Sequence, residues 1–228
     1  MGMDKGVCAM SKKVAIILSG CGGLDGSEIG ETICSILALE GGGFSWKAFS
    51  MDKLQKKVIS ALSMKEMNEK RNMMEESARI THGKIEDISK LEVNEFDVLW
   101  LPGGYGMVCS FSDIGEKGEN GSVSSEISTV IKKFHEQKKI IVGICIAPSV
   151  IAKSLEKVQL TITLGEAENF YSLLKRLGHN PKKVTSSEFI YDKEHKIYST
   201  PAYMDKNASC LKIFHTCQKI VGSINSNY

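Results

Sequence analysis

The sequence predicts one doubly wound α/β domain, with helices on both faces of a mostly parallel sheet. Short apolar runs alternate with longer amphipathic stretches along the 228 residues, a pattern typical of strands and helices that follow one another in such a sheet. Glycine-bearing turns follow several of the apolar runs. Hydrophobic residues (42%) and charged residues (25%) occur in the proportions of a globular protein.

The first half of the chain is expected to open with a buried strand over residues 14–18, followed by a glycine-rich loop over 19–26. A second strand is predicted over residues 44–49 and a third over 96–101. The helix after the glycine-rich loop is expected to face the core through its regularly spaced isoleucine and leucine side chains, Ile29, Ile33, Ile36 and Leu37.

Residues 53–80 differ from the rest of the chain because they are rich in Met, Lys and Glu. Helical spacing of Met and Ala side chains predicts a helix over residues 64–78 in an insertion or long connection. The simplest interpretation is a surface helix whose methionines fill gaps in the core. The alternative is an oligomer contact or a lid.

The second half repeats the alternation of strand and helix. The expected elements are a loop over 110–125, a helix over 126–137, a strand over 140–144, a helix over 148–155, short strands over 160–164 and 183–185 around a helix over 167–177, a hairpin from 189–191 and 196–200, and a final helix over 207–221.

Composition excludes several classes of protein. Net charge is only +2 and the lysines are scattered, which argues against a nucleic-acid surface with clustered basic residues. No apolar stretch approaches the roughly 20 residues that span a bilayer, and residues 1–11 lack the apolar run of a secretory signal. Seven cysteines without a Cys-x-x-Cys pair predict reduced thiols, and we expect the cytosol.

No metal or cofactor is expected. The five histidines are dispersed, and none stands at ligand spacing from another histidine or a cysteine pair. The glycine-rich loop departs from the dinucleotide pattern G-x-G-x-x-G, because Asp25 stands where the third glycine is needed. Cys210 and Cys217 share a helical face and are expected in the core.

Cys145 is the strongest candidate for a reactive residue. It follows an apolar strand directly, and Pro148 stands where a helix can begin. A cysteine at this junction would occupy a tight turn that resembles the nucleophile elbow of hydrolases. The helix N-terminus is expected to lower its pKa, and the backbone N–H of Ile146 to face an oxyanion on the substrate. The alternative is a small buried hydrophobic residue.

Two further turns are expected beside Cys145, because ligands of open parallel sheets bind beyond the carboxyl ends of the strands. The turn of residues 102–106, with Gly103 and Gly104, can present free N–H groups to an oxyanion. Glu28 lies near the start of the first helix. It either caps that helix or points to Cys145 as a protonated acid that hydrogen-bonds the thiolate.

Several motifs together resemble the enhancing-lycopene-biosynthesis (sigma cross-reacting) proteins, which are similar to glutamine amidotransferases and fall in the superfamily of the PfpI proteases and the Parkinson-associated deglycase. The resemblance covers residues 13–221. The motifs that carry it are Leu18 to Gly22, Asp25 to Ile29, Arg71 with Asn72, Ala78 to Ile80, Leu101 to Gly106, Cys145 to Pro148, and Thr200 to Met204.

The resemblance implies a flavodoxin-like domain over residues 12–222, preceded by a flexible segment of residues 1–11, and a homodimer or higher oligomer. It makes Cys145 the reactive elbow cysteine and Glu28 the acid that hydrogen-bonds it. Gly103 and Gly104 match the oxyanion-side turn, and Thr200 and Tyr203 match a loop beside the pocket. Some eukaryotic members are mitochondrial, which is the alternative to the cytosol.

The chain departs from its superfamily in having no catalytic histidine. Ile146 stands where the PfpI-type proteases place a histidine directly after the cysteine. No His-x-Glu pair follows late in the chain, and residues 160–165 offer no histidine. Protease and glutaminase activity are therefore not expected. His82 comes before the elbow in the chain, and a solvent-exposed loop is its expected position.

The resemblance implies a weak, cofactor-independent glyoxalase activity that converts small dicarbonyls, such as glyoxal and methylglyoxal, to hydroxy acids. Cys145 would attack an aldehyde, and Glu28 would move the proton between the two carbons. One alternative is a non-enzymatic redox or stress-response protein with an oxidisable Cys145. Another is a protein associated with isoprenoid metabolism that keeps the pocket without catalysis.

Overall fold

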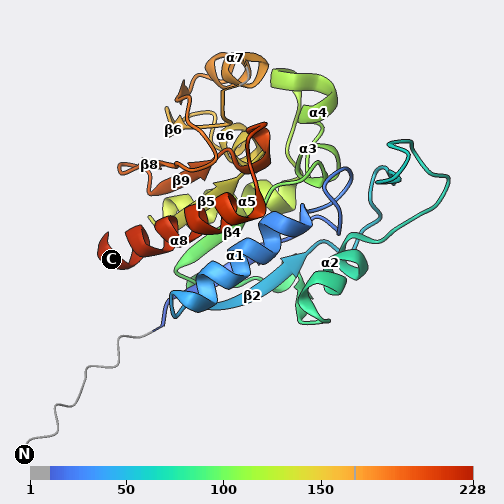
Figure 1. Cartoon of the computed structure of the whole chain (residues 1–228), viewed down its shortest axis with the longest axis horizontal. Coiled ribbons are helices and arrows are strands. Elements are labelled where there is room, and N and C mark those ends of the chain that lie inside the picture. The colour runs from blue at the N-terminus through green and yellow to red at the C-terminus, as the bar shows by residue number, and fades with distance from the viewer. Residues whose placement is uncertain (1–10, 167, 228) are drawn as a thin grey trace, which may run out of the picture.

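The computed structural model describes residues 11–166 and 168–227, and a seven-stranded sheet lies at its centre (Figure 1). The strand order is β3-β2-β1-β4-β5-β9-β8, and all neighbours are parallel except β8 and β9. The strands of the sheet are β1 (Lys13–Ile17), β2 (Ser45–Ser50), β3 (Ile85–Asp87), β4 (Val98–Leu101), β5 (Ile140–Ile144), β8 (Ile190–Asp192) and β9 (Ile197–Thr200). A separate parallel pair is formed by β6 (Thr161–Ile162) and β7 (Asn180–Pro181).

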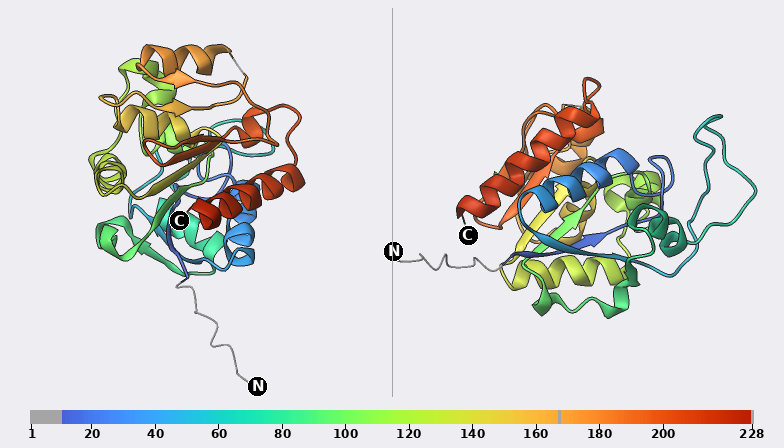
Figure 2. Two further views of the ribbon diagram at one scale, coloured as in Figure 1. Left: turned by 90° about the vertical axis from the view of Figure 1, so that its left-hand side faces the viewer. Right: turned by 60° about the horizontal axis from the view of Figure 1, so that its bottom comes forward.

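Helices cover both faces of the sheet, as the predicted fold class requires. Figure 2 shows α1 and α8 side by side on one face and α5 on the other. The helices are α1 (Ile29–Gly41), α2 (Met73–Thr81), α3 (Gly106–Cys109), α4 (Ile114–Lys117), α5 (Ser125–Glu136), α6 (Ala147–Ser154), α7 (Glu168–Arg176) and α8 (Cys210–Asn227), with short 3-10 turns at Ile88–Lys90, Val93–Glu95, Gly118–Asn120 and Ala202–Met204.

The central strands are buried on both faces, which explains their continuous apolar sequences. Every residue of β4 and β5 is buried, and so is β1 after its first residue. The helix α5 packs on the sheet through the predicted side chains Ile127, Val130, Ile131 and Phe134. The strands β8 and β9 form the predicted hairpin. The doubly wound fold class is therefore confirmed.

The buried face of α1 is not the predicted one. Of the four predicted side chains, Ile29, Ile33 and Leu37 are exposed and only Ile36 packs against the core. The buried side chains are instead those of Cys34, Ala38 and Leu39 and of the polar residues Glu31, Thr32 and Ser35. The small side chains let α1 approach α8 and the sheet closely. Hydrophobic spacing was misleading because this helix buries polar groups at the end of the sheet that carries Cys145.

Residues 53–72, here called the arm, do not form the predicted helix. The arm projects from the sheet as an extended loop (Figure 1) with isolated bridges from Leu54 to Asn72 and from Ile59 to Glu66. The helix α2 begins only at Met73, where Asn72 accepts hydrogen bonds from two backbone N–H groups of the first turn. Leu62 (97% exposed) and Met64 (67% exposed) do not fill gaps in the core.

Smaller differences lie near the C-terminal half. Residues 183–185 do not form the predicted strand. The strand in this region is β7 (Asn180–Pro181), which lies earlier in the chain. Cys217 is buried as expected, but Cys210 is exposed, so only one of the two thiols lies in the core. The predicted flexible segment of residues 1–11, except Ser11, and the predicted helix start at residue 167 lie outside the described residues. None of the helices described is long and apolar enough to cross a membrane.

A buried hydrogen bond between α1 and the sheet gives a test of this packing. The indole N–H of Trp100, which is fully buried, donates to Ser35 Oγ at 2.9 Å. We expect Ser35→Ala to lower the free energy of unfolding by about 1–3 kcal/mol, because the indole N–H loses its partner. Urea denaturation measures the change. Ser63→Ala in the exposed arm is the control, with an expected change of less than about 0.5 kcal/mol; equal effects of the two variants would contradict the packing.

Candidate active site

Cys145 occupies the predicted turn between β5 and α6. Its φ of +60° lies in the left-handed region, which is unfavourable for a residue with a Cβ. The neighbouring strand holds this conformation, because the N–H of Cys145 donates to the carbonyl of Thr200 at 2.9 Å. The residue is only 7% exposed, so the thiol is buried.

The acid that contacts Cys145 is Glu31, in the first turn of α1. Its carboxyl group hydrogen-bonds the thiol and is completely buried. The same carboxyl group accepts two backbone hydrogen bonds: Oε2 from Gly103 N at 3.0 Å and Oε1 from Tyr203 N at 3.3 Å. Glu31 therefore joins the elbow, the turn after β4 and the turn after β9.

The prediction that Glu28 hydrogen-bonds Cys145 is wrong. Glu28 is the N-cap of α1, and its Oε2 accepts from the N–H of Glu31 at 2.6 Å. A side chain that turns back onto its own helix does not reach the elbow, whereas Glu31 lies on the buried side with Cys34. Sequence analysis missed Glu31 because it assigned the opposite face of this helix to the core.

Burial has the largest effect on the pKa values of Glu31 and Cys145. It raises the pKa of Glu31 from 4.5 to about 7, with the charge of Glu28 adding to the effect. Burial also raises the pKa of Cys145 well above its ordinary value, and the negative charge of Glu31 acts in the same direction. The N–H groups of Gly104 and Ile146 oppose the rise by hydrogen-bonding the sulfur. The predicted low pKa of Cys145 is therefore not what the structure shows.

The two glycines of the turn after β4 lie against the elbow in different ways. The N–H of Gly103 donates to Glu31. Contrary to the prediction, it is therefore not free to bind an oxyanion. A Cβ on Gly103 would lie 2.4 Å from Cys145 Cβ and 2.6 Å from Glu31 Oε2, so only glycine fits between them. Gly104 (φ +100°) directs its N–H at the sulfur, which leaves Gly104 and Ile146 as the donors beside the reacting atom.

Thr200 and Tyr203 both lie at the site, but through their backbones. The carbonyl of Thr200 holds the elbow, and its hydroxyl donates to the carbonyl of Glu188 at 2.8 Å. Tyr203 contacts Glu31 through its N–H, while its phenol oxygen lies 2.9 Å from Cys210 Sγ. Neither side chain is among the groups that affect the pKa of Cys145 most.

Neither a histidine nor a metal-binding cluster supplements the pair within the part of the chain described. The main electrostatic partners of Cys145 include no histidine. His135 and His195 contact each other at 3.3 Å, and His179 contacts the backbones of Leu160 and Ala152. His82 ends α2 and is exposed, as expected. No three His, Cys, Asp or Glu side chains among residues 11–166 and 168–227 converge as metal ligands.

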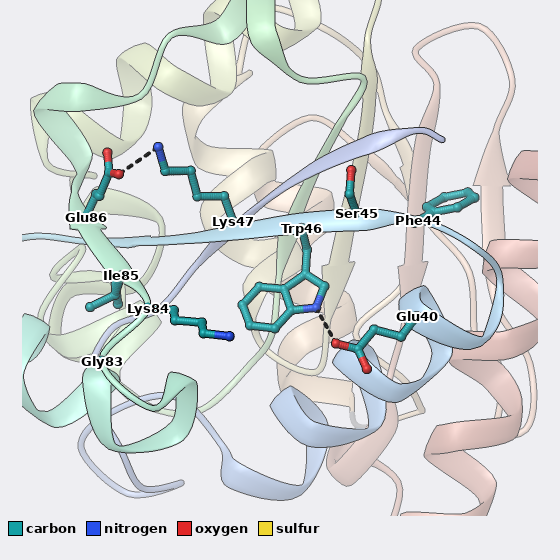
Figure 3. Close-up of a pocket in the computed structure, with 9 residues that line it drawn as sticks. All are labelled: Glu40, Phe44, Ser45, Trp46, Lys47, Gly83, Lys84, Ile85 and Glu86. Atoms are coloured by element: carbon teal, nitrogen blue, oxygen red, sulfur yellow. Dashed lines mark hydrogen bonds and ion pairs between the residues drawn. The ribbon is translucent and has the colours of Figure 1, made fainter. Parts of the chain in front are cut away.

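A cavity of about 540 Å³ lies elsewhere, between α1, β2 and β3 (Figure 3). Its lining includes Ser45 and Ile85, the first residues of two parallel strands. It therefore opens at the amino ends of the strands, opposite the end that carries Cys145. Lys47 and Glu86 form an ion pair of 2.7 Å across it, and Trp46 Nε1 donates to Glu40 at 2.9 Å. Four of the lining side chains form these two pairs, and the lining includes no thiol.

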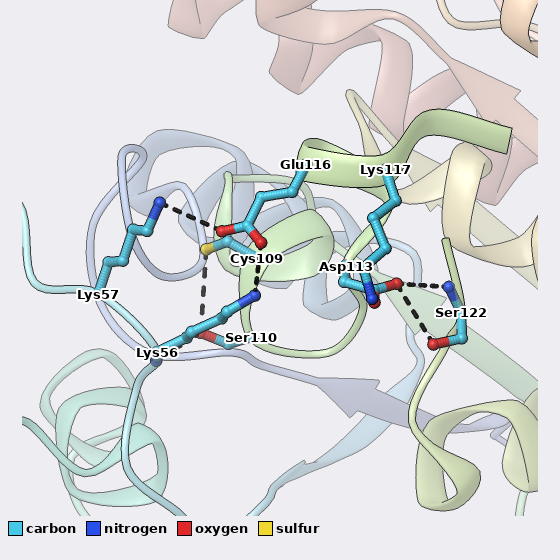
Figure 4. A network of polar contacts seen from close by, with 8 residues as sticks. All are labelled: Lys56, Lys57, Cys109, Ser110, Asp113, Glu116, Lys117 and Ser122. Carbon is cyan, nitrogen blue, oxygen red and sulfur yellow. Dashed lines mark hydrogen bonds and ion pairs between the residues drawn. The ribbon is translucent and has the colours of Figure 1, made fainter. Parts of the chain in front are cut away.

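The arm supports the glycine-rich loop beside the site. Its lysines Lys56 and Lys57 lie 2.9 and 3.2 Å from the carboxylate of Glu116 in α4 (Figure 4). Gln55 Nε2 donates to the carbonyl of Asp25 at 2.7 Å, and the Asp25 carboxylate accepts from a backbone N–H of the arm. The base of the arm is therefore anchored on both sides, whereas its tip is exposed.

The chain is similar in sequence to two mammalian proteins. The chain is 34% identical over 206 residues to the human glutamine amidotransferase-like class 1 domain-containing protein 3, mitochondrial, covering 86% of this chain and 76% of that protein. It is 35% identical over 202 residues to the rat ES1 protein homolog, mitochondrial, covering 84% and 75%. No family model matches the chain.

Solved structures show the same fold. An isoprenoid biosynthesis protein with an amidotransferase-like domain from Ehrlichia chaffeensis superposes with a TM-score of 0.88 at 32% identity, covering 95% of this chain and all (100%) of that one. DJ-1beta of Drosophila melanogaster superposes with a TM-score of 0.59 at 18% identity, over 94% of this chain and 90% of that one, and is a likeness of fold alone.

The contact between Glu31 and Cys145 predicts how the thiol titrates. We expect Glu31→Gln to lower the pKa of Cys145, because it removes a negative charge and a hydrogen bond that both favour the thiol form. The pH dependence of Cys145 alkylation by iodoacetamide, followed by mass spectrometry, measures the shift. Glu28→Gln makes the same chemical change at the helix cap and is the control. A larger shift in this control would contradict the assignment.

The buried carboxyl group also predicts a pH dependence of stability. Between pH 4.5 and about 7 the folded protein keeps a proton on Glu31 that the unfolded chain has lost. Stability therefore falls as the pH rises through this range, by about 3 kcal/mol in total, and is level above it. Urea denaturation of the wild type and Glu31→Gln at several pH values isolates this contribution as their difference. A difference that does not change with pH would refute it.

Proposed function

We propose that this chain, which belongs to the enhancing-lycopene-biosynthesis (ES1) family of glutamine amidotransferase-like proteins, is a cofactor-independent glyoxalase-type enzyme that converts small dicarbonyls to hydroxy acids. The observation that carries the proposal is the hydrogen bond between the Glu31 carboxyl group and the Cys145 thiol at the elbow. The pair combines a nucleophile with an acid that exchanges protons near neutral pH.

The first step joins Cys145 to glyoxal. Glu31 as a carboxylate accepts the thiol proton, and the sulfur forms a bond to one aldehyde carbon. The pair of electrons of the carbonyl bond moves to the oxygen, which takes the proton back from Glu31 to give a hemithioacetal and restore the carboxylate. The N–H groups of Gly104 and Ile146 lie beside the sulfur and support the developing oxyanion. The buried thiolate is therefore formed only during the attack, and both the starting thiol and the adduct are neutral at sulfur.

The second step moves a hydrogen between the two carbons. Glu31 takes the proton from the carbon bonded to sulfur, the electron pair left behind forms a double bond between the two carbons, and the aldehyde oxygen takes a proton, which gives an enediol. Glu31 then returns its proton to the neighbouring carbon, while the hydroxyl on the carbon bonded to sulfur loses its proton and becomes the carbonyl of a thioester of glycolate. Water then cleaves the carbon–sulfur bond, and glycolate leaves as the thiol is restored. The pKa of Glu31, about 7, suits both directions of transfer. The overall reaction adds one water to glyoxal and needs no redox partner.

The small exposure of the thiol favours a small substrate. Cys145 is 7% exposed and Gly103 fills the space beside it, so a peptide or a glutamine side chain has little room. The missing histidine further disfavours protease and glutaminase chemistry, which needs a group that takes the proton of the nucleophile and then gives it, as a general acid, to the leaving amine.

A second candidate is a redox or stress-response role, in which Cys145 itself is oxidised. The two N–H groups at the sulfur favour it, because they would hydrogen-bond the oxygens of a sulfinate. A third is a binding role in isoprenoid metabolism, supported by the name of the Ehrlichia chaffeensis relative, an isoprenoid biosynthesis protein. Oxidation of Cys145 by peroxide without dicarbonyl turnover would favour the second candidate. The absence of both activities would favour the third.

The cellular setting is also a proposal. The two mammalian relatives are named as mitochondrial, which favours the mitochondrion over the cytosol for this chain.

A homodimer or higher oligomer is supported by the exposed apolar stripe of Ile29, Ile33 and Leu37 along α1.

Turnover of glyoxal to glycolate tests the proposed activity. We expect Cys145→Ser to abolish measurable turnover and Glu31→Gln to lower kcat by on the order of 100-fold or more, because general acid–base catalysis is lost. Glu28→Gln should stay within a few-fold of the wild type, since Glu28 caps α1 and is not among the hydrogen-bond partners of the thiol. Glycolate is quantified by chromatography. Full turnover by Cys145→Ser, or a greater loss in Glu28→Gln than in Glu31→Gln, would exclude the mechanism.

A further inference from the structure

A second cluster of reactive groups lies where α1 meets the start of α8. The thiol of Cys34 donates to the backbone carbonyl of Cys210 at 3.3 Å, and the phenol oxygen of Tyr203 lies 2.9 Å from Cys210 Sγ. The carboxylate of Glu28 and the Tyr203 hydroxyl both lie within 3.3 Å of the point where Gly30 would carry a Cβ, and Cys210 Sγ lies 3.4 Å from it. Two cysteines far apart in the chain are thus neighbours at one corner.

The two thiols have complementary environments. Cys210 is exposed, and it is the first residue of α8. Cys34 is buried, and burial together with the nearby Cys210 raises its pKa to about 11. The Cys210 thiol is therefore open to solvent, and the neighbouring Cys34 thiol is buried.

The remaining thiols in the described residues lack this arrangement. Cys21 and Cys109 are half-buried, and burial raises the pKa of each. Cys217 and Cys145 are buried. Cys210 is thus the best placed of these thiols to meet an oxidant from solvent, and the sulfur of Cys34 lies 3.3 Å from the backbone carbonyl oxygen of Cys210.

We propose that Cys210 and Cys34 are a peroxide-responsive pair that forms a disulfide between α8 and α1. In the first step hydrogen peroxide oxidises the Cys210 thiol to a sulfenic acid: the sulfur forms a bond to one oxygen, the O–O bond breaks, and one water leaves. In the second step Cys34 sulfur attacks Cys210 sulfur, the S–O bond breaks, and the thiol hydrogen leaves with the hydroxyl as a second water. Peroxide is the only oxidant required.

The disulfide would fasten the C-terminal helix to the first helix. The two cysteines are 176 positions apart, so the closed loop includes most of the domain and restricts the unfolded chain strongly. Cys34 lies three residues after Glu31 on α1, and Tyr203 contacts both Glu31 and Cys210. The modification site therefore adjoins the Cys145 site, but its formation does not depend on the proposed glyoxalase activity.

Peptide mapping of the full chain after peroxide treatment tests the proposal. The reduced protein is exposed to hydrogen peroxide, free thiols are blocked with N-ethylmaleimide, and a non-reducing digest is analysed by mass spectrometry. We expect a linked pair of peptides containing Cys34 and Cys210 that dithiothreitol separates. We also expect a higher urea midpoint for the oxidised protein than for the reduced one.

Three variants sharpen the result. Cys34→Ser should abolish the link and leave a Cys210 sulfenic acid that dimedone labels. Cys210→Ser should abolish the link and leave Cys34 unmodified. Cys217→Ser, a change on the same helix, should keep the link. Oxidation of Cys145 alone, a disulfide between Cys210 residues of two chains, or no increase in dimedone labelling of Cys34→Ser would each overturn the proposal.

Discussion

The hydrogen bond between the buried carboxyl group of Glu31 and the thiol of Cys145 is the constraint around which this end of the sheet is organised. A carboxyl group without solvent needs hydrogen-bond donors or a proton. Here the turns after β4 and β9 each provide one N–H, from Gly103 and Tyr203. Three segments that are remote in sequence must therefore hold their places at once for the acid to remain buried.

This demand explains the shape of the turn after β4. Gly103 must pass between the thiol and the acid without a side chain, and Gly104 must take a left-handed conformation with the glycine-rich loop 2.2 Å from where its Cβ would be. The glycine-rich loop in turn receives hydrogen bonds from the base of the arm. A chain of close backbone contacts thus runs from the arm to the thiol.

The fold and the elbow were predictable because each depends on local pattern. Uninterrupted apolar runs mark buried parallel strands such as β5, and a cysteine directly after such a strand marks a tight turn. The acid was not predictable in the same way. Glu28 and Glu31 lie in one helical turn, and only the orientation of α1 decides which of them faces the sheet. That orientation follows from the small residues Cys34 and Ala38, which pack more closely than the isoleucines that dominate the hydrophobic pattern.

The arm shows a second limit of pattern analysis. Its methionines recur at helical spacing, yet a backbone hydrogen bond to the Asp25 carboxylate, the bridge between Leu54 and Asn72, and the ion pairs of Lys56 and Lys57 hold its base in an extended form. Tertiary anchors outweighed an intrinsic preference of a few tenths of a kcal/mol per residue. The predicted C-terminal helix was correct in kind but starts at Cys210, which leaves that thiol on the surface.

The left-handed backbone of Cys145 has a consequence for the history of this position. The neighbouring strand imposes the conformation through Thr200, so it does not depend on which residue stands there. Glycine would adopt it without strain, whereas a side chain costs on the order of 1 kcal/mol. Selection for stability alone would drift toward glycine. Cysteine at this position therefore carries a backbone cost that glycine would avoid, and a glycine here would keep the fold while removing the sulfur.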